Sequence, residues 1–115
     1  MRWRFYGSHR FEALRVDYSK VVDYLLNPEK SRGKAAFFLR MGFDPEQWEA
    51  LAHALKSQAR SGEISGAVES PYGTRYSVDG VMETPGSRSP GPRIRTVWIS
   101  EHGADEWRLI TAYPL

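Results

Sequence analysis

The stretch RIRTVWISEHGADEWRLITAYP, residues 93–114, decides the architecture that this sequence predicts. Two alternating runs, residues 93–100 and 107–114, flank the polar residues EHGADE, which is typical of two antiparallel strands joined by a turn. An earlier pair, EISGAVES and TRYSVDGVM, flanks the turn signal SPYG in the same way. The chain after Gly62 therefore predicts about four antiparallel strands.

Before Gly62 the apolar residues follow helical spacing. A short helix begins after Asp17 and must end at Pro28, and RGKAAFFLRMG predicts a second helix that ends at Gly42. A third helix has Asp44 as its N-cap and Pro45 in its first turn. We therefore expect an α+β domain, with about three helices on one face of a roughly four-stranded antiparallel sheet.

The same pattern predicts the domain organisation. Residues 1–16 mix aromatic residues with arginines and are expected to form an N-terminal arm or an edge strand. Residues 17–115 are expected to form one domain, with helices in 18–61 and the sheet in 63–114.

Composition narrows the function classes. The 115 residues contain no cysteine, which excludes disulfides and thiolate chemistry and fits a reducing compartment, so a cytoplasmic location is expected. No apolar run approaches the ~20 residues of a membrane span, so we expect no membrane partner. Residues 1–40 hold nine Lys and Arg against four Asp and Glu, a bias that suits a polyanion or a solvated surface.

The sequence contains no motif that is typical of a metal or cofactor site. The three histidines, His9, His53 and His102, fall in three separate segments, so neither a metal site nor a cofactor is expected. The SRGKA stretch fails as a phosphate loop because Pro28 stands where that motif needs a glycine. Lys34, near the start of the second helix, can still meet an anion.

Strand alternation predicts two faces for the last two strands. We expect the set Val97, Ile99, Ile110 and Ala112 to contact the helices. The uncovered face would then carry Thr96, Trp98, Thr111 and Tyr113. Such a face can bind a ligand.

Cleavage of RNA without a metal needs only proton transfer and stabilisation of charge on the phosphate, because the 2′-hydroxyl of RNA is the nucleophile. Arginine, lysine, histidine, tyrosine and threonine can supply both. Arg75, Arg95 and Arg108 lie on predicted strands, and Tyr76 follows Arg75 directly. Strand arginines also serve to keep sheet edges soluble, which is the alternative interpretation.

Four segments carry a resemblance: KVVDYLLNPEKSRGKAAFFLRMGFDPEQWEALAHAL, YGTRYSVDG, RTVWISEHG and RLITAYP. Together they resemble an uncharacterised bacterial domain family, over about residues 16–114. Its members occur as small stand-alone proteins and at the C-termini of secreted polymorphic toxins. The layout is similar to the ribonuclease fold of barnase, EndoU, colicin-type tRNA nucleases and RelE-like toxins. The resemblance implies a metal-independent endoribonuclease of toxin type. RNA, with tRNA and mRNA both open, and a small acidic antitoxin or immunity protein would be its partners.

By motif position, the resemblance implies these catalytic residues: Lys34, Tyr76, Thr96, Arg108, Thr111 and Tyr113. It implies substrate binding by Trp98, and the strand arginines Arg95 and Arg75 are added as substrate-binding candidates. Relatives often have a histidine before the Gly-Lys-Ala motif, where this chain has Glu29 and Lys30. If that histidine is the acid–base group of the family, either this member is weak or inactive, or His9 or His102 takes its place.

Two points stay open at the level of sequence. Strict alternation places Arg108 and Thr111 on opposite faces, and a bulge would be needed to bring them together. A non-catalytic protein-binding module of the same fold, using its open sheet face, is the alternative function. The sequence leaves the oligomeric state open.

Overall fold

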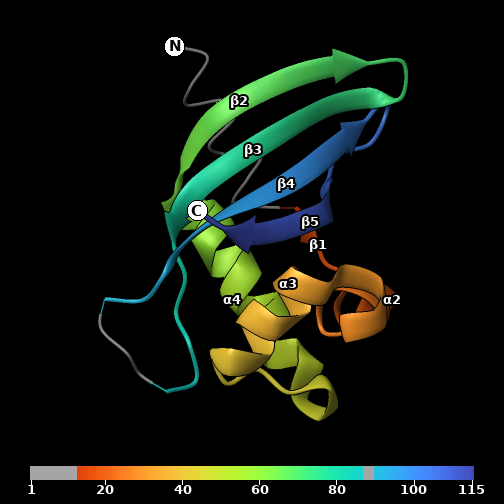
Figure 1. Ribbon diagram of the computed structural model, residues 1–115. Helices are drawn as coiled ribbons and strands as arrows, with labels where there is room; N and C mark the ends of the chain where they lie inside the picture. Colours follow the sequence, from red (N-terminus) through yellow and green to blue (C-terminus); the bar gives the residue numbers. More distant parts are fainter. Residues whose placement is uncertain (1–12, 87–89) are drawn as a thin grey trace.

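The computed structural model describes residues 13–86 and 90–115. One short strand precedes the helical region, and four longer strands follow it (Figure 1). The elements, in chain order, are β1 (Leu14–Arg15), α2 (Tyr18–Lys20), the π-helix η1 (Val21–Leu25), α3 (Pro28–Arg40), the 3-10 helix η2 (Pro45–Gln47), α4 (Trp48–Ser61), β2 (Glu63–Ser70), β3 (Gly73–Val81), β4 (Arg93–Glu101) and β5 (Trp107–Pro114).

The strands form one five-stranded sheet in the order β1-β5-β4-β3-β2. β2 to β5 are antiparallel neighbours, whereas β1 joins β5 in parallel and pairs Leu14 with Trp107. The predicted α+β class is confirmed, and the sheet has one strand more than expected. That strand lies within the segment predicted as an arm or edge strand, of which residues 1–12 are outside the described part.

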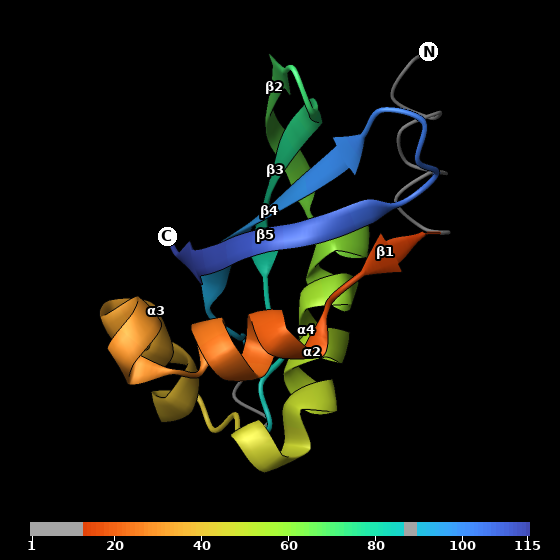
Figure 2. The same cartoon turned by 90° about the vertical axis from the view of Figure 1, so that its right-hand side faces the viewer.

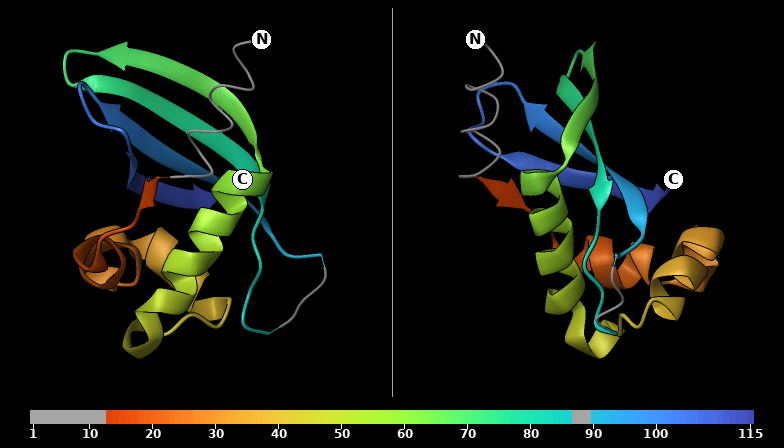
Figure 3. Two further views of the ribbon diagram at one scale, coloured as in Figure 1. Left: turned by 180° about the vertical axis from the view of Figure 1, so that it is seen from behind. Right: turned by 90° about the vertical axis from the view of Figure 1, so that its left-hand side faces the viewer.

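The described helices are not spread evenly over the sheet. α4 crosses one face and contacts β3 and β4, as Figure 3 shows from behind. α2, η1 and α3 lie below β5, and both α2 and α3 contact this strand (Figure 2). No described helix crosses the other face of β2, β3 and β4, which we call the open face (Figure 1).

Local sequence explains where the helices begin. The Asn27 side chain accepts a hydrogen bond from the Glu29 N–H at 2.9 Å, and Asp44 caps the next helical segment through the Glu46 N–H at 2.9 Å. A proline follows each cap, in the first turn, where its missing N–H costs nothing. Asp44 and Pro45 begin a helical segment as predicted, but this segment is the 3-10 helix η2, and α4 itself begins at Trp48. α3 begins four residues earlier than the predicted Arg32.

The close approach of the first residue of β3 to β4 requires a glycine. Gly73 has a φ of 151°, and a Cβ at this position would collide with the Ser100 carbonyl of β4. Only a residue without a side chain lets β3 begin so close to β4.

Candidate functional site

Register fixes which side chains share the open face, because residues directly opposite each other in a sheet point to the same side. Three rows cross β3, β4 and β5. They are Arg75–Ile99–Arg108, Ser77–Val97–Thr111 and Asp79–Arg95–Tyr113. Two arginines thus end the first row, and two predicted hydroxyl groups, those of Thr111 and Tyr113, lie in the other two.

The predicted placement of Thr96 and Trp98 on the open face was wrong. Both side chains are fully buried beneath α4. Val97 and Ile99, expected to face the helices, lie on the open face instead, where Ile99 is nevertheless buried. Both alternating sets of β4 contain apolar residues, and the one with the large Trp98 side chain fills the core.

A polar network explains how the core accepts the Thr96 hydroxyl. Thr96 donates to Gln58 Oε1 at 2.8 Å and accepts from Trp98 Nε1 at 2.7 Å. Gln58 Nε2 donates to the carbonyls of Val78 and Ile94, each at 3.0 Å. The network joins α4 to β3 and β4, so Thr96 and Trp98 stabilise the fold from within the core.

Tyr76 also belongs to the core. It is buried, and its ring stacks on Trp107 with the centroids 4.4 Å apart and an interplanar angle of 9°. Tyr76 therefore lies in the inward set of β3, where its aromatic ring contributes by burial, and its catalytic role stays a prediction.

A register shift in the β4–β5 ladder provides the bulge that the Arg108–Thr111 pair required. Val97 pairs with Thr111, but the next residue, Trp98, pairs with Leu109, which leaves Ile110 as the extra residue. Arg108 and Thr111 consequently share the open face. Ala112 is buried as predicted, whereas Ile110 is only half-buried.

Tyr24 links two predicted site residues, Lys34 and Thr111, at the edge of β5. The sequence interpretation did not include Tyr24 in the site. Lys34 Nζ donates to the Tyr24 hydroxyl at 2.7 Å, and the same hydroxyl lies 3.5 Å from Thr111 Oγ1. Lys20 Nζ also lies 5.1 Å from the centre of the Tyr24 ring. We call these four residues, Lys20, Tyr24, Lys34 and Thr111, the Tyr24 cluster.

The cations of the cluster change the acidity of its phenol. The pKa of Tyr24 is lowered chiefly by the hydrogen bond from Lys34, then by the hydrogen bond with Thr111, and also by the charges of Lys34 and Lys20. Partial burial opposes this shift without reversing it. The cluster can therefore exchange a proton at Tyr24 and hold an anion at Lys34.

Irregular backbone places Tyr24 and Lys34 side by side. Tyr24 lies in the π-helix η1, and α3 is kinked at Arg32, whose φ is 34°. The Ser31 hydroxyl donates to the Tyr24 carbonyl at 2.6 Å and so ties the two segments together. π-turns and strained residues are frequent at functional sites, and here both adjoin the same pair of side chains.

Arg95 and Tyr113 lie in the row next to Thr111. Arg95 makes a bidentate ion pair with Asp79, through Nε at 2.7 Å and Nη2 at 2.9 Å. The pKa of Asp79 is lowered mainly by this contact, and that of Arg95 is raised by Asp79 and Tyr113. Because a carboxylate already neutralises Arg95, this arginine is a weaker phosphate ligand than the sequence implied.

The remaining predicted residues lie outside the Tyr24 cluster. Arg108 pairs with Glu101 at 3.4 Å, and Arg75 is exposed on β3 in the same row. His102 is exposed in the turn between β4 and β5, where its backbone N–H donates to the Tyr72 carbonyl. His9 is outside the described residues.

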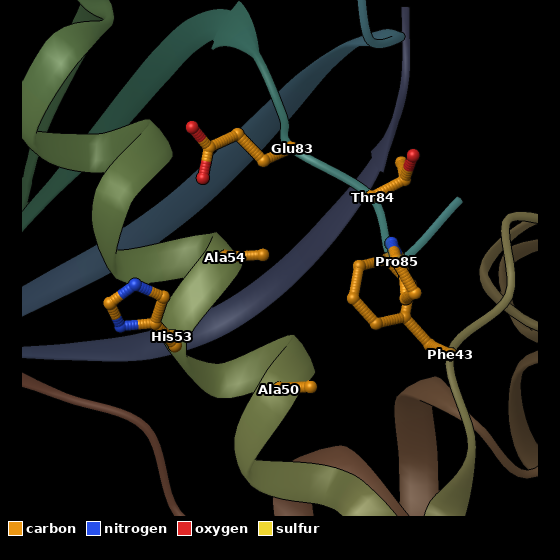
Figure 4. Close-up of a pocket in the computed structure, with 7 residues that line it drawn as sticks. All are labelled: Phe43, Ala50, His53, Ala54, Glu83, Thr84 and Pro85. Atoms are coloured by element: carbon orange, nitrogen blue, oxygen red, sulfur yellow. The ribbon is translucent and has the colours of Figure 1, made fainter. Parts of the chain in front are cut away.

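A hollow of about 220 Å³ lies between α4 and the chain that follows β3 (Figure 4). Its lining is mostly apolar, and it contains none of the predicted site residues: it consists of Phe43, Ala50, His53, Ala54, Glu83, Thr84 and Pro85. The Tyr24 cluster has more of the groups that proton transfer and anion binding require.

Within residues 13–86 and 90–115, no group of three or more His, Asp or Glu side chains is arranged to hold a metal ion. In the same ranges, no helix has the length and apolarity needed to cross a membrane.

The comparisons with known proteins define the family and not its activity. The chain belongs to the DUF6883 family, a domain of unknown function, whose model matches residues 9–115. No curated protein matches the chain. No solved structure matches it.

Proposed function

We propose that this domain is a metal-independent endoribonuclease of toxin type that acts in the cytoplasm and is neutralised by a small acidic antitoxin or immunity protein. The observation that carries the proposal is the contact of Lys34 with Tyr24, beside Thr111 at the edge of the open face. It supplies a cation and an ionisable hydroxyl at one place, which are the two elements that cleavage of RNA by its own 2′-hydroxyl requires.

The charges near the cluster support a polyanionic substrate. Arg75 and Arg108 lie on the open face in the row adjacent to Thr111, and Lys20 and Lys34 approach from the helices. We propose that the RNA backbone lies along β5 with the scissile phosphate at Lys34. An acidic partner that covers the same cations would exclude RNA, which accounts for the proposed neutralisation.

Expression in bacteria tests the proposal. The wild type, the double variant Arg108→Ala, Thr111→Ala and the control Arg60→Ala would be compared at equal protein levels by growth and by total-RNA analysis. Arg60 is exposed on α4, at the helix C-terminus. Growth arrest with new RNA fragments in the wild type and the control, but not in the double variant, is expected. Intact RNA with the wild type would refute the proposal.

A second candidate function, a non-catalytic protein-binding module, is favoured by the β2–β3 hairpin. Val68 and Tyr72 are 64% and 75% exposed there, and Val68 shares the open face with Arg75. Exposed apolar side chains of this size are typical of contact surfaces. Under this alternative, Val68→Ser and Tyr72→Ser would abolish binding of the partner while RNA stays intact with every variant.

A further inference from the structure

We infer that Tyr24, as its phenolate, is the catalytic residue that takes the proton from the attacking 2′-hydroxyl of RNA. This inference rests on the proposed function and names the base that the proposed reaction needs. Tyr24 begins the Tyr-Leu-Leu stretch of the first segment that carries the resemblance, but the sequence assigned it no role, and it becomes a candidate through its contacts in the folded chain.

Three segments of the chain meet at the Tyr24 hydroxyl. Tyr24 itself is on η1, Lys34 reaches it from α3 at 2.7 Å, and Thr111 lies 3.5 Å away on β5. Tyr24 is only partly buried, and its hydroxyl contacts Thr111 of β5, whose side chain shares the open face with Arg108. A base must come within hydrogen-bond reach of its proton, and this hydroxyl is at the edge of the proposed RNA track.

Electrostatics favours the base form of this group. Lys20 from α2 and Lys34 from α3 approach Tyr24, and their Nζ atoms lie 5.1 Å and 5.2 Å from the centre of its ring. The lowered pKa of Tyr24 agrees with this arrangement, since each ammonium stabilises the phenolate. A larger fraction of the base is thus present near neutral pH than for a tyrosine in water.

Lys34 and Thr111 have separate tasks in this scheme. Lys34 points an N–H at the Tyr24 oxygen, so it stabilises the phenolate and leaves its other N–H groups for a phosphate oxygen. The Thr111 hydroxyl can orient the 2′-hydroxyl or the phenolate oxygen from the strand side. Both are therefore placed to contact the reacting groups.

The step balances as a transesterification. The phenolate oxygen of Tyr24 takes the 2′-hydroxyl proton, and the 2′-oxygen attacks the adjacent phosphorus. The bond from phosphorus to the 5′-oxygen breaks, the 5′-oxygen takes a proton from water, and a 2′,3′-cyclic phosphate remains. Tyr24 then returns its proton to solvent, so nothing is oxidised or reduced.

A pH–rate profile of purified protein on a defined RNA tests the inference, with Tyr24→Phe compared with the control Tyr18→Phe. Tyr18 is exposed on α2. We expect Tyr24→Phe to lose roughly 100-fold or more in kcat, as for removal of a general base, whereas Tyr18→Phe keeps its rate. The wild-type rate should rise with pH and level off below the usual tyrosine pKa, and the variant should lose this rise.

A measurement of RNA binding distinguishes loss of the catalytic step from loss of the RNA-binding site. Affinity for the same RNA with a 2′-deoxy sugar at the cleaved linkage should be unchanged in Tyr24→Phe. Equal rates for Tyr24→Phe and the wild type would refute the role of Tyr24 and leave the proposed ribonuclease intact. No cleavage by the wild type at any pH would overturn both.

Discussion

Lys34 donates a hydrogen bond to Tyr24 across the junction of η1 and α3, with 2.7 Å between Nζ and the phenol oxygen. The two residues lie ten positions apart in the sequence, and the kink at Arg32 is between them. Both side chains are half-buried next to Thr111. The pair thus places an ammonium group, which can bind an anion, beside a phenol, which can exchange a proton, at the edge of β5.

Replacing Lys34 with Gln should raise the pKa of Tyr24 toward that of a free tyrosine. The Lys34 hydrogen bond is the largest cause of the lowered pKa, whereas Lys20 acts only through its charge, so Lys20→Gln should raise the pKa less. Near-ultraviolet tyrosinate absorbance, taken as the difference between each protein and its Tyr24→Phe counterpart, measures this. A Tyr24 pKa that is the same in the wild type and Lys34→Gln would contradict the described contact.

Thr96→Val should lower the stability of the fold and leave the Tyr24 cluster unchanged. The substitution removes the acceptor of Trp98 Nε1 and the donor to Gln58 Oε1, both buried, which should cost about 1–3 kcal/mol in the free energy of unfolding. Urea denaturation measures this cost, and activity per folded molecule should not change.

Thr111→Val is the matched control, with the same chemical change on the neighbouring strand. Its hydroxyl makes a long contact at a half-buried position, so stability should change little while activity falls. If Thr96→Val lost activity while keeping its stability, the structural role of the buried network would be wrong.

The fold was largely predictable from local patterns, and the site was not. Asp44 and Pro45 mark a helix start, and EHGADE marks a turn, through chemistry that is local in sequence. Thr96 and Trp98 were misplaced because both faces of β4 contain apolar residues, so alternation alone does not select the inward one. The extra residue at Ile110 depends on pairing with β4, and the approach of Tyr24 to Thr111 depends on how η1 lies against β5.

Asp79→Asn should make stability less sensitive to acid. The pKa of Asp79 is lower in the folded chain, so its pair with Arg95 stabilises the fold above the unfolded pKa of about 3.9 and loses this effect as pH falls toward the folded pKa. The wild type should therefore be the more stable protein at neutral pH, and the difference should shrink below about pH 4. Thermal unfolding across this range tests the sign, and a constant difference would contradict it.

Glu101→Gln should strengthen RNA binding by releasing Arg108. The Glu101 carboxylate lies 3.4 Å from Arg108 Nη2 and competes with a phosphate for this cation. Affinity for non-cleavable RNA should rise, and the salt dependence of binding should steepen by about one phosphate contact. Arg108→Ala should change both quantities in the opposite direction. Unchanged affinity in Glu101→Gln would place the RNA elsewhere.

The products formed by the purified protein give the sharpest test of the proposal that the Tyr24 cluster cleaves RNA. The wild type and the double variant Tyr24→Phe, Lys34→Gln would be incubated with a defined RNA in the presence of a metal chelator, and the new ends would be identified by mass spectrometry. We expect fragments ending in a 2′,3′-cyclic phosphate from the wild type and intact RNA from the folded double variant. Intact RNA with the wild type, or the same fragments with both proteins, would contradict it.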